Sequence, residues 1–194
     1  MNFLAHIYLS GDNELVRIGN FMADGIRGKE YESYPADIQK GIMLHRAIDS
    51  FTDAHPIFRA GTKRLHSKYH HYSGVVMDLY YDHFLAKNWS RYSTESLESF
   101  ADLFYRSLEE NFELLSAKTK SILPIMKDHN WLVSYATIEG LSRIFWNMDR
   151  RTGNESKMSS ATTELLQYYN EYELEFSDFF QELYNMATQK LSEL

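Results

Sequence analysis

The sequence predicts an all-α protein that folds as a single-domain helical bundle. Only three prolines and nine glycines occur in 194 residues, so few positions interrupt a helix. Apolar residues recur at spacings of three and four along most of the chain, which is the period of a helix with one buried face. No stretch of useful length alternates between apolar and polar residues, as a strand would. A chain that is 44% apolar and 15% aromatic has enough core-forming residues for one domain over 1–194.

The first half of the chain divides into helices at its glycines and prolines. A short, nearly all-apolar helix is expected over 2–9, and a second over 13–26, where glycines at the end stop it. Pro35 suits the first turn of a central helix, which runs to about residue 54 because Pro56 stops it. We expect the next two helices over 57–69, which is basic, and over 75–89.

The second half begins with Thr94, a reasonable N-cap for a long amphipathic helix that runs through Phe112. The chain is expected to break around Pro124, and one or two further helices should cover 131–148. The last segments are expected to be a loop over 150–160 and one long acidic helix from 161 to the end.

Charge and composition limit the function. The net charge of −7 argues against a general nucleic-acid binder. The charge is uneven, since residues 1–94 hold 11 Lys/Arg and 10 Asp/Glu and the remainder holds 9 and 17. If a cation neutralises acids of the first half, the surface around them becomes basic, and an anionic substrate or partner becomes plausible. The candidate rim residues are Arg17, Arg27, Lys29, Arg46, Arg59, Lys63, Arg64 and Lys68, although each can equally be an ordinary solvated charge.

The chain has no cysteine, so a metal could be held only by His, Asp or Glu, and the absence of thiols fits a reducing cytoplasm. The first nine residues, MNFLAHIYL, lack the basic region and cleavage site of a signal peptide. No run approaches the roughly 18 apolar residues of a membrane span. We therefore expect a cytoplasmic protein that is not bound to a membrane.

The stretch 41–55, GIMLHRAIDSFTDAH, carries the densest chemistry. It places His45, Asp49 and Asp53 four residues apart, on one face of the central helix. At about 100° per residue, His45 and Asp49 fall within the arc of the apolar residues and therefore point inward. A buried imidazole and a buried carboxylate need compensation, which is a hydrogen bond, a counter-charge or a metal ion.

A second stretch, VVMDLYYDHFLAKNW over 75–89, repeats the pattern. Asp78 and Asp82 lie four residues apart among apolar positions, and two such acids repel each other unless a cation or a proton lies between them. The mixed set of imidazoles and carboxylates suits Mn²⁺, Fe²⁺ or Zn²⁺, in one or two sites. The set is too large for one ion, so some members must orient the ligands or act as acids and bases on water. The candidates are His6, Asp24, His45, Asp49, Asp53, Asp78, Asp82 and His83.

Several candidates also have plain structural explanations. His6 can be a hydrogen-bonded core histidine, and Asp24 lies away from the apolar face of its helix and can be an ordinary helix-end residue. Asp53 can cap a helix end, although an acid near a C-terminus opposes the helix dipole. We exclude the remaining histidines of the first half, which are explained by a backbone contact before Pro56 or by solvent exposure; they are His55, His66, His70 and His71.

Five ordered stretches of the chain resemble one family. They are MNFLAHIYLS at 1–10, GNFMADGIRG at 19–28, GIMLHRAIDSFTDAHP at 41–56, DLYYDHFLAKNW at 78–89 and WLVSYATIEGLSRIFWNMDRR at 131–151. These residues are similar to the acyl carrier protein phosphodiesterase family. The resemblance implies an all-helical, HD-like fold related to the metal-dependent HD phosphohydrolases, with Mn²⁺ as cofactor. It implies hydrolysis of the phosphodiester between 4′-phosphopantetheine and a serine of holo acyl carrier protein.

We then assign roles within this resemblance. Asp24, His45, Asp49 and Asp82 are expected to be metal ligands. The other four candidates, His6, Asp53, Asp78 and His83, are expected to orient ligands or to act as acids and bases. Arg27 and Arg46 are expected to clamp the substrate phosphate, unless each pairs with a buried carboxylate.

One feature departs from the HD pattern. The adjacent pair is Asp82 followed by His83, the reverse of the order that names the HD superfamily, so the residue roles of HD enzymes are not transferred. Other divalent ions such as Mg²⁺ remain possible cofactors.

Two other functions remain open. An HD-like phosphohydrolase that acts on nucleotides or other small phosphoesters would ignore acyl carrier protein. A non-enzymatic helical protein that binds carrier proteins or metal would show affinity without turnover.

Overall fold

The computed structural model describes residues 1–194, and helices are its only regular secondary structure. The predicted all-α class is confirmed. The α-helices are α1 (Phe3–Tyr8), α2 (Glu14–Met22), α3 (Ala36–Ala54), α4 (Pro56–Tyr69), α5 (Ser73–Lys87), α6 (Leu97–Glu110), α7 (Ala117–Asp128), α8 (Trp131–Ser134), α9 (Ile138–Arg151), α10 (Ala161–Gln167) and α11 (Tyr169–Glu193). The short 3-10 helices are η1 (Ala23–Gly25), η2 (Glu30–Ser33), η3 (His70–Tyr72), η4 (Trp89–Arg91), η5 (Phe112–Leu114) and η6 (Met158–Ser160).

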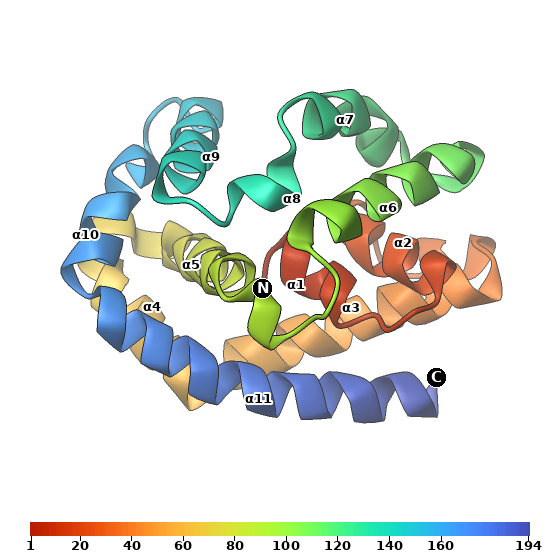
Figure 1. Ribbon diagram of the computed structural model, residues 1–194, viewed down its shortest axis with the longest axis horizontal. Helices are drawn as coiled ribbons and strands as arrows, with labels where there is room; N and C mark the ends of the chain where they lie inside the picture. The colour runs from red at the N-terminus through yellow and green to blue at the C-terminus, as the bar shows by residue number, and fades with distance from the viewer.

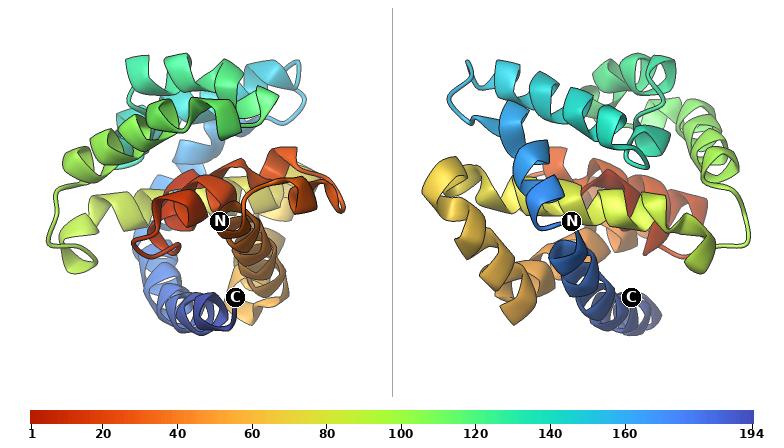
Figure 2. Two further views of the ribbon diagram at one scale, coloured as in Figure 1. Left: turned by 90° about the vertical axis from the view of Figure 1, so that its right-hand side faces the viewer. Right: turned by 60° about the vertical axis from the view of Figure 1, so that its left-hand side comes forward.

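The helices form layers around α1 and α5 (Figure 1). The segment from α6 to α9 lies on one side of these two central helices, whereas α3, α4 and α11 lie on the other side, and both turned views in Figure 2 keep this order. The central position of α5 agrees with its burial, since 11 of its 15 residues are buried, including the polar residues Asp82 and His83. The 49 buried apolar side chains form one contiguous core.

Three boundaries differ from those expected. Ser96, rather than Thr94, caps α6, because its side chain accepts a hydrogen bond from the backbone N–H of Ser99. Pro124 does not break the chain but lies on the exposed face of α7, whose inner face holds Leu123 and Met126 in the core on both sides of it. The expected terminal helix is two helices, because α10 and α11 are separated at Tyr168.

Glycines bring α2 and α3 into backbone contact. A Cβ atom at Gly19 would lie 2.2 Å from the carbonyl oxygen of Ile38, and one at Gly41 would lie 2.2 Å from the carbonyl oxygen of Val16. Only glycine permits such a close approach. The crossing places Asn20 of α2 beside His45 of α3, and it is therefore the packing contact that assembles the polar cluster described below.

No helix of the structure is both long enough and apolar enough to span a membrane.

Candidate functional site

A polar cluster lies where α1, α2 and α3 meet. His6 comes from α1, Asn20 from α2, and His45 with Asp49 from α3. The amide nitrogen of Asn20 donates to the carbonyl oxygen of His6 at 3.0 Å and to the hydroxyl of Ser10 at 2.8 Å. The carbonyl oxygen can only accept, and the Ser10 hydroxyl donates its own hydrogen to that carbonyl, so both partners accept from Asn20. The Asn20 amide therefore has one orientation, with its oxygen directed at the two imidazoles.

The amide oxygen of Asn20 fixes the tautomer of both histidines. It lies 2.8 Å from Nδ1 of His6 and 3.2 Å from Nδ1 of His45. An oxygen can only accept, so each Nδ1 carries a hydrogen, and in a neutral ring each Nε2 is left with a free lone pair. This is the state in which histidine binds a metal ion through Nε2.

Both Nε2 atoms face carboxylates. Nε2 of His6 lies 3.2 Å from Asp49 Oδ1, and Nε2 of His45 lies 3.0 Å from Asp49 Oδ2 and 3.2 Å from Asp24 Oδ1. The lone pairs of an unprotonated nitrogen and a carboxylate oxygen repel each other at this distance. A cation is therefore required between them, and it can be a proton or a metal ion.

The two histidines respond to this environment in opposite ways. Burial lowers the pKa of His6 to about 4, despite its contact with Asp49, so its Nε2 carries no proton near neutral pH and has no hydrogen-bond partner. Burial also acts to lower the pKa of His45, but the carboxylates of Asp24 and Asp49 outweigh it and raise that pKa to about 9. The pKa values of both carboxyl groups are correspondingly lowered: the contact with His45 is the main cause for Asp24, whereas for Asp49 the contacts with His45 and His6 overcome burial.

The donor set fits a divalent metal ion. Ligand atoms from His6, His45 and Asp49 all lie within 4.8 Å of one another. Ligands at about 2 Å from a common ion are themselves roughly 3 to 4 Å apart, so little movement would be needed to bind one. An ion here would also give the orphaned Nε2 of His6 its missing partner. Two imidazoles and one carboxylate suit Fe²⁺, Mn²⁺ or Zn²⁺ and leave coordination positions for other ligands.

His45 and Asp49 of the cluster form part of the wall of a cavity of about 490 Å³. The side formed by α1, α3 and α5 is acidic and contains Asp24 from η1 together with Asp49, Asp53 and Asp78. The opposite side comes from the layer that contains α7, α8 and α9. It combines apolar side chains with two cations, and its residues include Ile122, Trp131, Ile144, Met148, Lys118 and Arg151.

The chain was also compared with known proteins. Residues 1–183 match the family described as acyl carrier protein phosphodiesterase. The chain belongs to this family. Relatives named acyl carrier protein phosphodiesterase include one from Photorhabdus laumondii, which is 29% identical over 98% of this chain and 96% of the relative. Another, from Pectobacterium atrosepticum, is 28% identical over 98% of this chain and 100% of the relative. A third, from Escherichia coli, is 28% identical over 98% of this chain and 99% of the relative.

No solved structure matches the chain. The family is thus established by sequence, and the expected relation of the fold to the HD-type hydrolases stays a prediction.

The structure does not bring Asp82 to the candidate metal-binding cluster of His6, His45 and Asp49. The Asp82 side chain is completely buried on α5, and its carboxylate oxygens accept from the backbone N–H groups of Leu4 at 2.8 Å and Ala5 at 3.3 Å. These N–H groups belong to the first turn of α1 and need an acceptor. In this structure Asp82 therefore caps the helix that carries His6, and its expected role as a ligand stays a prediction.

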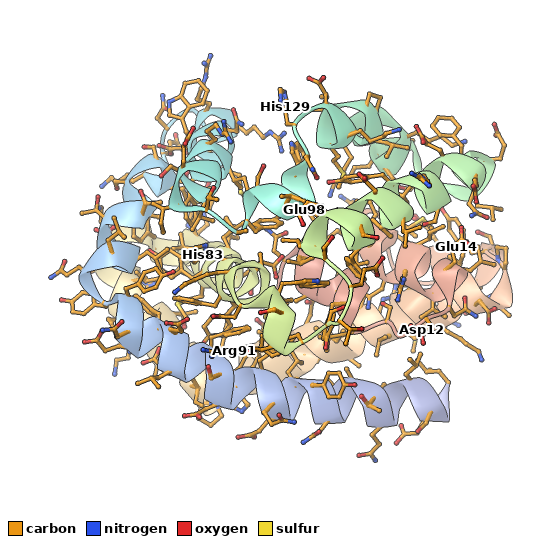
Figure 3. The ribbon with its side chains drawn as sticks, viewed as in Figure 1. Asp12, Glu14, His83, Arg91, Glu98 and His129 are labelled. Atoms are coloured by element: carbon orange, nitrogen blue, oxygen red, sulfur yellow. The ribbon has the colours of Figure 1, made fainter.

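His83 is also placed away from the cluster. Its side chain points from α5 toward Tyr135, which follows α8, and toward Tyr169 of α11. Figure 3 labels His83. Its Nδ1 lies 2.7 Å from the carbonyl oxygen of Tyr135, and its Nε2 lies 2.7 Å from the hydroxyl of Tyr169. Both ring nitrogens therefore have partners inside the protein, and the expected role of His83 as an orienting, acid or base residue stays a prediction.

Asp53 and Asp78 do line the cavity, as carboxylates beside Asp49. Asp53 is exposed and has no ion-pair partner in the structure, whereas Asp78 lies 2.8 Å from the α-amino group of Met1. Burial raises the pKa of Asp78, and the ammonium group opposes that change.

The two predicted phosphate-binding arginines lie outside the cavity wall. The guanidinium of Arg46 donates to the carbonyl oxygen of Gly28 at 2.8 Å and stacks on the ring of Tyr31 at 4.9 Å, so it fixes the segment between η1 and α3. Arg27 is exposed beyond that wall. The cations that face the acidic side are instead Lys118 of α7 and Arg151 of α9.

Sequence reasoning missed Asn20, Lys118 and Arg151. Asn20 lies in the GNFMADGIRG stretch, and a buried amide next to a helix-packing glycine is a signal that could have been used. Lys118 and Arg151 could not be found in this way, because their approach to the site depends on how the layer of α7 and α9 folds over α1 and α5.

Proposed function

We propose that this protein hydrolyses the phosphodiester that joins 4′-phosphopantetheine to a serine of holo acyl carrier protein, with Mn²⁺ as its cofactor. The products are apo acyl carrier protein and 4′-phosphopantetheine. The observation that carries the proposal is the cluster of His6, His45 and Asp49, of which His45 and Asp49 line a cavity that also presents cations, in a chain of this family.

A phosphodiester is anionic and resists attack, so an enzyme must neutralise its oxygens and activate water. An ion held by His6, His45 and Asp49 would act as a Lewis acid toward a phosphate oxygen. It would also lower the pKa of a water molecule that it binds, so that a nucleophile is available near neutral pH. Asn20 would keep both imidazoles in the tautomer that binds an ion. Asp24, which is exposed and lies 3.2 Å from Nε2 of His45, is proposed as a further ligand.

The other cavity residues would bind and orient the substrate. Lys118 and Arg151 face the acidic wall, where they can pair with the phosphate oxygens that the ion does not contact. The apolar side chains of Trp131, Ile144 and Met148 can pack against the pantetheine arm and exclude water around it.

Asp53 is proposed as the acid and base of the reaction. It lies one helical turn beyond Asp49 on α3, is exposed to the cavity and has no ion-pair partner. It can therefore accept a proton from the attacking water and return one to the serine oxygen when the bond from phosphorus to that oxygen breaks.

The choice of Mn²⁺ rests on the mixed donor set and on the family resemblance, since two imidazoles and one carboxylate suit Mn²⁺ as well as Fe²⁺ or Zn²⁺. The proposal places the reaction in the cytoplasm, because a chain without cysteine fits a reducing compartment.

The test is the mass of purified holo acyl carrier protein after incubation with the protein and Mn²⁺. We expect the carrier to lose its prosthetic group, and we expect EDTA or Asp49→Asn to prevent this loss. Asp178→Asn, the same change on the exposed face of α11, is the matched control and should retain activity. If the carrier mass stays unchanged with folded, metal-loaded protein, the assignment to carrier protein fails, and hydrolysis of nucleotides and small phosphodiesters is the reaction to assay next.

A further inference from the structure

The exposed face of α9 combines an aromatic ring with cations. Arg143, Trp146 and Arg150 follow one another at spacings of three and four, so they share one face of the helix. The Trp146 side chain is 50% exposed, and the guanidinium of Arg150 stacks on its ring at 4.6 Å. Arginine and tryptophan are the residues that most often dominate protein interfaces. We call Arg143, Trp146 and Arg150 the α9 face.

This face is basic within an acidic half of the chain. Residues 95–194 hold 9 Lys/Arg and 17 Asp/Glu. Around the α9 face, however, Arg151 and Lys157 add two more cations, and the neighbouring Asp149 is buried, where serine side chains occupy its oxygens. The exposed acids of this region are Asp128, Glu139 and Glu155, so its four cations outnumber them by one, whereas acids clearly outnumber cations in the half as a whole.

The cations near the cavity form few close ion pairs within the protein. No carboxylate lies within 4.0 Å of Arg150, Arg151 or Lys118, and Arg143 has only Glu139 at 3.6 Å, with both of these side chains largely exposed. By contrast, Arg64, Lys68 and Lys87 elsewhere on the surface each pair with a glutamate of α10 or α11. Unpaired cations on one face attract an anionic partner and increase its rate of association.

The α9 face is continuous with the cavity. A surface hollow of about 770 Å³ is lined by Arg143 and Trp146, and it shares Trp131, Ile144 and Asn147 with the cavity wall. His129, labelled in Figure 3, lies at the same edge of the molecule and also lines the hollow. A protein bound over α9 would thus lie beside Trp131, Ile144 and Asn147, which belong to the wall of the cavity that contains Asp49.

We propose that the α9 face is the docking surface for the acyl carrier protein, which it recognises as a small protein with an acidic surface. This inference rests on the proposed function for the identity of the partner. Arg143 and Arg150 pair with carboxylates of the carrier, and Trp146 packs between them against its surface. The arm then enters along the wall formed by Trp131 and Ile144.

The test compares the wild type with an Arg143→Glu/Arg150→Glu double variant and with Trp146→Ala. Arg59→Glu, the same charge reversal on the exposed side of α4, is the matched control. We measure the Kd for apo acyl carrier protein, the KM for holo acyl carrier protein, and the rate of hydrolysis of bis(p-nitrophenyl) phosphate, a small diester that needs no docking. We expect the double variant to raise Kd and KM about tenfold at low salt, with little effect at high salt. Trp146→Ala should weaken binding at both salt concentrations.

Hydrolysis of the small diester should be unchanged in both variants, which would show that they fold and bind metal. Equal Kd values for apo carrier in the wild type and the double variant would overturn the docking surface. The two proposals fail separately: if wild-type protein never releases 4′-phosphopantetheine but binds apo carrier through α9, docking is supported and the proposed reaction is not.

Discussion

The imidazole rings of His6 and His45 stack on each other, with ring centroids 4.1 Å apart and an interplanar angle of 21°. Two stacked imidazoles cannot both be charged at low cost, and the lowered pKa of His6 beside the raised pKa of His45 agrees with this. The amide oxygen of Asn20 accepts from the Nδ1–H groups of both rings and so fixes their orientation on the side away from Asp49. The tautomer that would bind a metal ion at this candidate site therefore depends on a residue that does not itself line the cavity.

Replacing Asn20 should lower metal affinity without removing a ligand. In Asn20→Leu the two imidazoles lose their common acceptor and can rotate or change tautomer, so we expect Mn²⁺ affinity to fall about 10- to 100-fold. Asn20→Asp keeps an acceptor for both Nδ1–H groups and should retain more of the affinity, although it loses the donor bonds to His6 and Ser10. Calorimetric titration with Mn²⁺ measures the affinity of the wild type and of both variants. An equal loss of Mn²⁺ affinity in Asn20→Leu and Asn20→Asp would contradict the tautomer argument.

Substitution of Asp82 separates a helix cap from a metal ligand. In Asp82→Asn one of the two acceptors for the first turn of α1 becomes a donor, so we expect a loss of about 1 to 2 kcal/mol in the free energy of unfolding. Metal affinity should change only a few-fold, because no ligand is lost. Denaturant unfolding and Mn²⁺ titration provide the two measurements, with Asp49→Asn as the reference for a true ligand. A loss of Mn²⁺ affinity as large as that of Asp49→Asn would return Asp82 to the ligand set.

The helical class and the central stretch were predictable because both depend on local periodicity. The four-residue spacing of His45, Asp49 and Asp53 places them on one face of α3 in any fold that contains this helix. The same periodicity correctly predicted that the Asp82 side chain is buried, but a helical wheel predicts burial and nothing more. It cannot show which of two buried partners, a metal ion or the N-terminus of α1, the carboxylate meets.

The remaining site residues depend on tertiary contacts. Asp24 lies at a helix end, where periodicity carries no information, and only the packing of η1 against α3 places it beside His45. The basic wall was expected from the first half of the chain, yet it comes from Lys118 and Arg151, because α7 and α9 cover the acidic side of the cavity. Contacts between distant segments of this kind leave no pattern in a single sequence.

The glycine contact between α2 and α3 should be sensitive to one methyl group. In Gly41→Ala the new Cβ would lie 2.2 Å from a backbone oxygen of α2, so the helices must separate, and we expect a loss of about 1 to 3 kcal/mol in the free energy of unfolding. Metal affinity should fall as well, since the same crossing holds Asn20 against His45. Gly74→Ala is the control, because no atom lies within 4 Å of its Cβ position, and it should be neutral or slightly stabilising. Similar unfolding midpoints for the two variants would show that the crossing can relax without cost.

The stability of the metal-free protein should fall as the pH rises from about 6.5 to 9. Burial lowers the pKa of His45, but the contacts with Asp24 and Asp49 raise it overall from 6.5 to about 9. A group whose folded-state pKa is raised contributes stability that is fully present below the unfolded value and is lost as the pH rises through the folded value. The proton on His45 also competes with a metal ion for Nε2, so added Mn²⁺ should raise the melting temperature more at pH 8.5 than at pH 6.5.

Melting temperatures with EDTA and with Mn²⁺ at these two pH values measure both effects. His45→Gln is the control, because it removes the titrating group, and its difference in Tm between pH 6.5 and 8.5 in EDTA should be smaller than that of the wild type. If wild type and His45→Gln lose stability equally over this range, the proton held between His45 and the two carboxylates does not contribute to folding. In that case the raised pKa of His45 would not describe the metal-free protein.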